Sequence, residues 1–204
     1  MRFLLDVSEN KYQNIAGDLL VAGQLITPLT RYSKWASSFA IDNGAFSRFD
    51  PDAFRAIIAR EQPAMEQCLF VVAPDVVGNA RRTMELWVRR HRYIGTSWPI
   101  AFAAQDGAEH LTIPWNEMKA LFIGGTDSWK DGCEARDLVK TAKILGLHVH
   151  IGRVNTPKRF KHFSDLGADT CDGNGVGRYD HMLNAIRESL ELPENGSLWD
   201  LPQE

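Results

Sequence analysis

The chain has 204 residues, of which 44% are apolar and 24% charged, a composition typical of a folded globular protein with one core. The net charge of −3 argues against a protein that coats nucleic acid indiscriminately, because such binding depends on neutralising many phosphates. No apolar run reaches the roughly 18 residues that span a membrane, and the three scattered cysteines indicate neither a zinc knuckle nor a disulfide framework, so we expect a cytoplasmic protein.

Short apolar runs alternate with helical stretches along the chain. The predicted strands are Phe3–Val7, Leu19–Ala22, Phe39–Ile41, Leu69–Ala73, Ile100–Ala104, Leu121–Ile123, His148–Ile151 and Ala168–Cys171. The predicted helices are Asp52–Glu61, Ala80–Tyr93, Glu134–Leu145, Lys158–Leu166 and Asp180–Leu190. Short strands that are apolar throughout are typical of parallel strands covered on both faces.

This alternation favours a compact (β/α)8 TIM-like barrel over residues 1–192, followed by a polar tail over residues 193–204. The chain is short for such a barrel, so several helices must be short or missing. We expect those gaps around residues 8–37 and 107–119. No GxGxxG motif follows the first strand, which disfavours a dinucleotide-binding Rossmann fold.

Polar residues follow six consecutive predicted strands. These segments are Asp42-Asn43-Gly44-Ala45-Phe46, Pro74-Asp75, Gln105-Asp106-Gly107, Gly124-Gly125-Thr126-Asp127, Gly152-Arg153-Val154-Asn155 and Asp172-Gly173-Asn174-Gly175. Any one of them is typical of a turn. In a barrel, however, the carboxyl ends of all strands meet at one face, where active sites lie. Six polar segments at equivalent positions therefore predict a site at that face.

Five of the segments, read in chain order, resemble the tRNA-guanine transglycosylase superfamily. They are Ile41-Asp42-Asn43-Gly44-Ala45-Phe46, Gln105-Asp106-Gly107, Phe122-Ile123-Gly124-Gly125, His150-Ile151-Gly152-Arg153-Val154-Asn155-Thr156-Pro157 and Leu166-Gly167-Ala168-Asp169-Thr170-Cys171-Asp172. The corresponding family landmarks are a D-S-G-G-F-Q turn, a Q-G step, an I-G-G step, a G-V-G-T-P segment and a G-x-D-x-x-D segment. The resemblance spans residues 39–175.

The chain departs from the family pattern in ways that suggest a particular branch. The family's zinc module has no counterpart, and Asn43 and Ala45 replace the serine and the second glycine of the first motif. A shortened, zinc-free chain is most similar to the deazaguanine DNA-modification (DpdA-type) proteins. That resemblance implies exchange of guanine in DNA, rather than in tRNA, for a free 7-deazaguanine such as a preQ-type base, with no metal and no cofactor.

The resemblance also implies roles for two aspartates. Asp172 matches the nucleophile and Asp42 the general acid/base. Breaking an N-glycosidic bond places positive charge on C1′, which one carboxylate can trap while a second group manages the proton of the base. Asp169 competes for the nucleophile role, but the family motif places the reactive carboxylate second.

The remaining pocket residues follow from the chemistry of guanine. Asp75 can accept hydrogen bonds from N1–H and the N2 amine, and Gln105 can both donate and accept. Backbone amides at Gly124 and Gly125 can approach O6 closely because glycine has no Cβ, and Phe46 can stack on a flipped base.

Phosphates beside a flipped nucleotide need cations, and four lie near the proposed site in sequence. They are Arg153, Lys158, Arg159 and Arg178. We further expect His148 and His150 to alternate along their strand, to face opposite sides and to be unable to hold one metal ion together. Cys171 is expected to be buried in its strand.

Alternatives remain open. The same chemistry with water as acceptor would make the chain a DNA glycosylase or nucleoside hydrolase. The chain could also be a non-catalytic DNA- or base-binding subunit that partners another protein. A homodimer or a complex with a partner subunit is compatible with either function. An unrelated phosphosugar isomerase would bind phosphate near Gly173-Asn174-Gly175.

Overall fold

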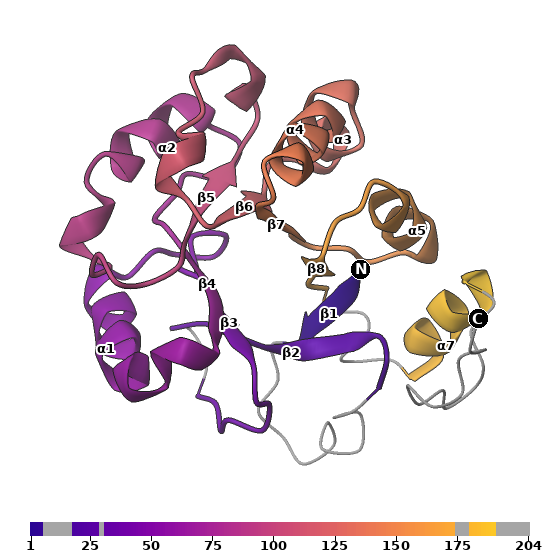
Figure 1. The fold of residues 1–204 in the computed structure, drawn as a ribbon, viewed down its shortest axis with the longest axis horizontal. Helices are drawn as coiled ribbons and strands as arrows, with labels where there is room; N and C mark the ends of the chain where they lie inside the picture. Colours follow the sequence, from indigo (N-terminus) through magenta and orange to yellow (C-terminus); the bar gives the residue numbers. More distant parts are fainter. Residues whose placement is uncertain (6–17, 29–30, 174–179, 191–204) are drawn as a thin grey trace.

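A computed structural model describes residues 1–5, 18–28, 31–173 and 180–190, and these residues form a closed barrel of eight parallel strands (Figure 1). The strands are β1 (Arg2–Leu5), β2 (Val21–Ile26), β3 (Phe39–Ile41), β4 (Cys68–Val72), β5 (Ile100–Ala104), β6 (Ala120–Ile123), β7 (His148–Ile151) and β8 (Thr170–Cys171). Each strand pairs with the next in the chain, and β8 closes the ring by pairing with β1. The predicted TIM-like barrel is confirmed.

Helices surround the ring of strands (Figure 1). They are α1 (Pro51–Glu61), α2 (Ala80–Trp87), α3 (Asp127–Lys130), α4 (Cys133–Ile144), α5 (Pro157–Asp165) and α7 (Asp180–Ser189). Their starts follow local sequence signals. Asp50 caps α1 by accepting the N–H groups of Asp52 and Ala53, and Thr156 caps α5 in the same way through the N–H of Arg159.

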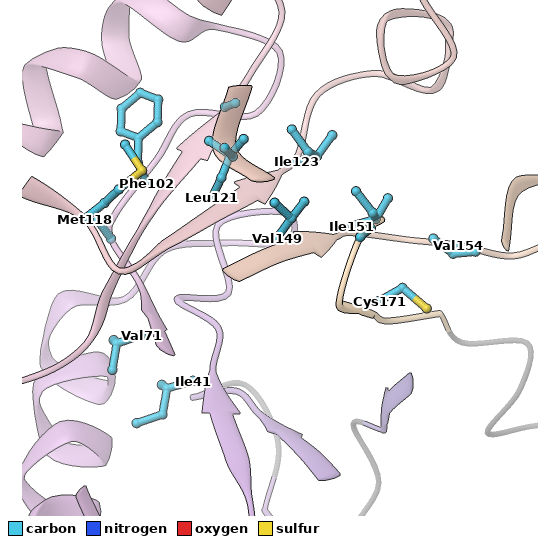
Figure 2. Packing of buried hydrophobic residues seen from close by; sticks show 14 of the residues in the cluster. Ile41, Val71, Phe102, Met118, Leu121, Ile123, Val149, Ile151, Val154 and Cys171 are labelled. Atoms are coloured by element: carbon cyan, nitrogen blue, oxygen red, sulfur yellow. The ribbon is translucent and has the colours of Figure 1, made fainter. Parts of the chain in front are cut away.

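The strands bury both of their faces. Outward-facing side chains from β5, β6 and β7 pack toward the helices, among them Phe102, Leu121, Ile123, Val149 and Ile151 (Figure 2). A second apolar cluster lies on the opposite, inward face and consists of Leu4, Leu25, Ala40, Phe70, Val72, Ala101, Ala103 and Ala120. Burial on both sides explains why these strands are apolar at consecutive positions.

The predicted strands agree closely with the structure. Phe39–Ile41, Ile100–Ala104 and His148–Ile151 agree residue for residue. The second strand was misplaced, because it runs from Val21 to Ile26 rather than over Leu19–Ala22. Gly23 and Gln24 interrupt its apolar pattern, and Gly23 is needed because a Cβ there would lie 2.2 Å from the carbonyl oxygen of Ser38. Residues 6 and 7 of the first predicted strand lie outside the described residues.

Helix α2 ends earlier than predicted. It stops at Trp87, and a 3₁₀ turn, η3 (Arg90–Arg92), replaces the rest of the predicted helix Ala80–Tyr93. Arg90 is 6% exposed and donates a hydrogen bond to the Trp87 carbonyl at 3.0 Å. That contact satisfies a carbonyl that the helix itself leaves free at its end.

Two connections lack an α-helix, as expected from the length of the chain. Residues 107–119 carry only the 3₁₀ turns η4 (Ala108–His110) and η5 (Trp115–Glu117). Between β2 and β3, the described residues 27–28 and 31–38 contain no helix. The predicted tail, residues 193–204, lies outside the described part of the chain. Within that part, no helix combines the length and apolar character that crossing a bilayer requires.

Candidate active site

A cavity of about 530 Å³ opens at the carboxyl ends of the strands. Its walls come from loops after β3, β4, β5, β6, β7 and β8, and its floor includes Leu4, Leu25, Val72 and Phe122 from inside the barrel. The predicted residues that line it are Asp42, Phe46, Asp75, Gln105, Gly124, Gly125, Arg153 and Asp172. Barrel closure therefore brings together residues that are widely separated in the sequence.

Asp42 lies in the tight turn that follows β3. Its backbone N–H continues the sheet by donating to the Ile26 carbonyl at 2.8 Å, and its Oδ1 accepts the N–H of Gly44 at 3.2 Å. Burial in the cavity wall, reinforced by the neighbouring carboxylate of Asp172, raises the pKa of Asp42 from 3.8 to about 7. Asp42 can therefore hold or release a proton near neutral pH.

Asp172 follows β8 and its side chain is 17% exposed. Its Oδ2 lies 3.1 Å from Nε2 of His150, and its Oδ1 accepts the backbone N–H of Arg153 at 3.0 Å. Arg153 has a φ of 60°, the one non-glycine residue in the left-handed region among those described, and this conformation accompanies the contact with Asp172. The carboxylate is thus held from two sides.

Asp75 is fixed by two buried amides. Asn43 donates from Nδ2 to Oδ1 at 2.8 Å, and Gln105 donates from Nε2 to Oδ2 at 2.6 Å. Burial raises the pKa of Asp75, and these two hydrogen bonds oppose the shift. Asn43 also accepts the N–H of Ala45 at 2.7 Å, so it joins the Asp42 turn to Asp75.

Gln105 and the two glycines form one compact unit. The Oε1 atom of Gln105 accepts the N–H groups of Gly78 at 2.9 Å and Gly125 at 2.7 Å. The N–H of Gly124 donates to the Ala104 carbonyl at 2.9 Å. The backbone amides predicted to reach O6 of the base are therefore already used within the protein. Gly124 and Gly125 shape the cavity wall instead.

Phe46 and Arg153 meet at the mouth of the cavity. Phe46 is 64% exposed, so it is not a core residue, and the Arg153 guanidinium lies 4.5 Å from the centre of its ring. Arg153 also donates to the carbonyl of Gly125. An exposed aromatic ring beside a fixed cation provides a flat surface on which a base can stack.

The other predicted phosphate ligands differ in their availability. Lys158 is exposed at the start of α5. Arg159 makes two hydrogen bonds to Asp131, at 3.0 and 2.8 Å, and lies 3.3 Å from Asp127. These carboxylates compete with any phosphate for its charge. Arg178 lies outside the described residues.

The two histidines of β7 correct a prediction. His148 and His150 do not face opposite sides, because Nε2 of His148 and Nδ1 of His150 both lie within 2.9 Å of the same Thr170 hydroxyl. Side chains two residues apart on a strand share a face. Both rings point into the barrel, and the sequence reasoning missed His150 as a contact of Asp172. The spacing His-x-His in β7, opposite the Thr-x-Asp that begins in β8 and ends just after it, was the signal that could have revealed it.

Asp169 is held at the opposite end of β8 from Asp172. Lys143 donates to both of its oxygens, at 2.8 and 2.7 Å, and the N–H of Val149 donates to Oδ2 at 2.8 Å. Asp169 lines a second cavity, of about 390 Å³, that also includes Arg2 and His148. It lies outside the lining of the larger cavity. Cys171 is fully buried, as predicted.

Fold and cavity together define a TIM-barrel protein with four aspartates, Asp42, Asp75, Asp127 and Asp172, around one pocket at the carboxyl ends of its strands. Among the residues that the structure describes, no group of three or more His, Cys, Asp or Glu side chains is arranged to hold a metal ion.

Neither a protein-family model nor a curated protein sequence matches the chain. Solved structures resemble it in fold. A crystal structure described as a glycerophosphoryl diester phosphodiesterase from Silicibacter pomeroyi is 16% identical with a TM-score of 0.49, over 77% of this chain and 52% of that one. A flavocytochrome b2 variant is 14% identical with a TM-score of 0.54, over 94% of this chain and 64% of that one. This chain spans less than two thirds of either protein, and the likeness concerns the barrel fold.

Proposed function

We propose that the chain is a base-exchange transglycosylase that replaces guanine in nucleic acid, DNA rather than tRNA, by a free 7-deazaguanine. The observation that carries this proposal is that Asp42 and Asp172 line one cavity but differ in their surroundings. Asp172 is held by two hydrogen-bond partners, while burial raises the pKa of Asp42 to about 7. Cleavage of a glycosidic bond requires one carboxylate that attacks the sugar and a second carboxyl group that transfers a proton.

The first half of the reaction removes guanine. An Oδ atom of Asp172 forms a bond to C1′ while the C1′–N9 bond breaks, and the electron pair of that bond goes to the purine ring. Protonated Asp42 gives its proton to the departing base. The products are free guanine, a glycosyl ester on Asp172 and an Asp42 carboxylate.

The second half inserts the new base. The Asp42 carboxylate takes the N9 proton of the incoming 7-deazaguanine, and N9 forms a bond to C1′ as the ester bond to Asp172 breaks. Both aspartates return to their starting protonation states. Asp75, fixed by Asn43 and Gln105, can accept the N–H groups of either base during both halves.

The test is an exchange assay on DNA that carries labelled guanine, with candidate 7-deazaguanines supplied and both the released and the inserted base measured by mass spectrometry. We expect wild-type protein to release guanine over many turnovers only when it inserts the new base, and to release at most one guanine per protein molecule when no acceptor base is supplied. Asp172→Asn should abolish exchange, while the matched variant Asp169→Asn should retain it, because Asp169 lies outside the pocket. Without an acceptor base, intact-mass measurement should detect a glycosyl adduct on the wild type.

Three results would overturn the proposal in different ways. Release of more than one guanine per protein molecule without insertion of another base would indicate hydrolysis. Binding of DNA or base without release of guanine would indicate a binding subunit. Loss of exchange in Asp169→Asn, with exchange retained in Asp172→Asn, would move the nucleophile to Asp169.

A further inference from the structure

Four polar side chains of β7, β8 and the residue after β8 form a hydrogen-bonded row inside the barrel, which we call the file. In order, they are His148, Thr170, His150 and Asp172. Nε2 of His148 lies 2.7 Å from the Thr170 hydroxyl, which lies 2.9 Å from Nδ1 of His150. Nε2 of His150 then lies 3.1 Å from Oδ2 of Asp172. His148 and Thr170 line the smaller cavity at the opposite end of the barrel, whereas Asp172 lines the candidate active site. The file therefore connects the two ends.

The surroundings of this file are apolar. The ring of Phe122 stacks on His150 with centroids 5.0 Å apart, and the ring of Phe70 lies 5.1 Å from His150 and 5.4 Å from His148. A buried imidazole with an unpaired nitrogen would destabilise the fold. His150 is fully buried, and both of its nitrogens have partners.

With a neutral His150, the hydrogen bonds of the file have one consistent direction. The Thr170 hydroxyl has a single hydrogen and is shared by two imidazole nitrogens. If Nε2–H of His150 donates to the Asp172 carboxylate, neutral His150 has a bare Nδ1 that must accept the Thr170 hydrogen. The Thr170 oxygen then accepts Nε2–H of His148. Every hydrogen in this arrangement has one acceptor.

We propose that His150 is a positioning residue for Asp172, held by Thr170 and His148 as the neutral tautomer that donates from Nε2 to the carboxylate. This inference rests on the proposed function only in that Asp172 is the nucleophile. Together with the N–H of Arg153, which binds the other carboxylate oxygen, His150 fixes the orientation of Asp172 beneath C1′. A neutral donor orients the carboxylate without neutralising its charge, as the orienting partner of a catalytic side chain should.

Burial, more than the surrounding charges, keeps His148 neutral at the end of the file away from Asp172. Burial lowers the pKa of His148 to about 4, and the nearby positive groups Lys143 and Arg2 act in the same direction, against the opposing effect of Asp169. The rings of Phe70 and Phe122 and the hydroxyl of Thr170 contact His150 from β4, β6 and β8, and Asp172 is its charged partner. At neutral pH, His148 therefore has a single proton to offer Thr170.

The direct test reads the tautomers in the free protein. Nitrogen NMR of imidazole-labelled wild-type protein at pH 7 should show His148 and His150 both protonated at Nε2 and bare at Nδ1. A His150 that carries its proton on Nδ1, or that is doubly protonated, would overturn the inference. This measurement needs neither a variant nor substrate, so its result stands apart from whether base exchange is found.

Variants supply the second test. His150→Gln keeps an amide N–H that can reach Asp172, whereas His150→Leu does not. Thr170→Ser keeps the hydroxyl, whereas Thr170→Val removes it in nearly the same volume. We expect His150→Leu and Thr170→Val to lower kcat on the order of 10²-fold with little change in KM, and the Gln and Ser variants to recover most of it.

In folded Thr170→Val, the nitrogen spectrum should also show a mixture of His150 tautomers. Equal kcat in the Val and Ser variants, or an effect confined to KM, would contradict the positioning role.

Discussion

Four aspartates show how strongly surroundings divide one side-chain type into different roles. Asp42 is partly buried near another carboxylate, Asp75 is fixed by two amides, Asp169 is paired with Lys143, and Asp172 is held by His150 and a backbone N–H. In the proposed reaction, the same carboxyl group would therefore serve as an acid, an acceptor, a structural anchor or a nucleophile. Differences in local electrostatics are the physical basis for such a division of roles between carboxylates.

The raised pKa of Asp42 predicts a pH-dependent effect on stability. Its pKa in the folded protein, about 7, lies above its ordinary value of 3.8. The stabilising contribution of the protonated side chain is thus complete below about pH 4 and is lost as the pH rises through about 7. Asp42→Asn should unfold with a free energy higher than wild type at pH 8, by on the order of 1–3 kcal/mol.

Urea unfolding at pH 4 and at pH 8 measures this difference, which should shrink toward zero at the lower pH. The exposed Asp165→Asn is the control, since Asp165 lies on the surface in an ion pair with Lys161. A stability gain for Asp42→Asn that is the same at both pH values would show that ionisation of Asp42 is not its source. The same variant should lose base exchange, because its amide cannot transfer the proton.

The ends of individual strands determine the shape of the pocket. Gly124 follows β6, where an added Cβ would lie 2.3 Å from Nε2 of Gln105 and 3.2 Å from the Ala104 carbonyl. Gln105 is 1% exposed and bonds to Gly78, Gly125 and Asp75, so it has little room to move. A side chain at Gly124 would therefore displace the Gln105 amide, and through it disturb the loops after β4, β5 and β6.

Gly124→Ala should weaken binding of free 7-deazaguanine by roughly 10-fold, since it breaks at least one hydrogen bond that orients Asp75. Calorimetric titration of the base measures the change. Gly95→Ala is the control, because its Cβ would meet only Trp98 at an ordinary 3.8 Å. Unchanged base affinity in Gly124→Ala would remove Gln105 and Asp75 from the base-binding role.

Over the whole molecule, the charge balance limits how nucleic acid can bind. The net charge is −3, Arg159 is paired with carboxylates, and Arg153 is partly buried against Phe46 and Gly125. If the chain binds nucleic acid as proposed, binding must therefore depend on few cations near the pocket and on a base inside it, rather than on a broad basic surface. That arrangement suits a single flipped nucleotide.

Among the predicted phosphate ligands that the structure describes, Lys158 is the exposed one. Lys158→Ala should weaken DNA binding and reduce the slope of log affinity against log salt by about 1. Affinity measured by fluorescence anisotropy over a range of salt concentrations gives the slope. Lys161→Ala on the same helix is the control, because Lys161 is paired with Asp165. An equal change in both variants would indicate a general charge effect and no phosphate contact at Lys158.

Sequence pattern was sufficient to predict the barrel, nearly all of its strands and the polar residues at their ends. Those features depend on local order along the chain: apolar runs, capping residues and glycines. The second strand escaped because Gly23 and Gln24 hide its pattern, and Gly23 is explained only by the approach of Ser38 from another segment.

The partners of the polar side chains required the folded barrel. Closure of the barrel places Asp42 and Asp172 in one cavity and brings His150 within hydrogen-bond distance of Asp172. It also gives Arg159 and the backbone amides of Gly124 and Gly125 hydrogen-bond partners within the protein. These contacts join loops far apart in sequence, and each donor or acceptor has several candidate partners until packing selects one. Periodicity shows which face a side chain occupies, whereas its protonation and hydrogen bonds depend on what the other strands bring to that face.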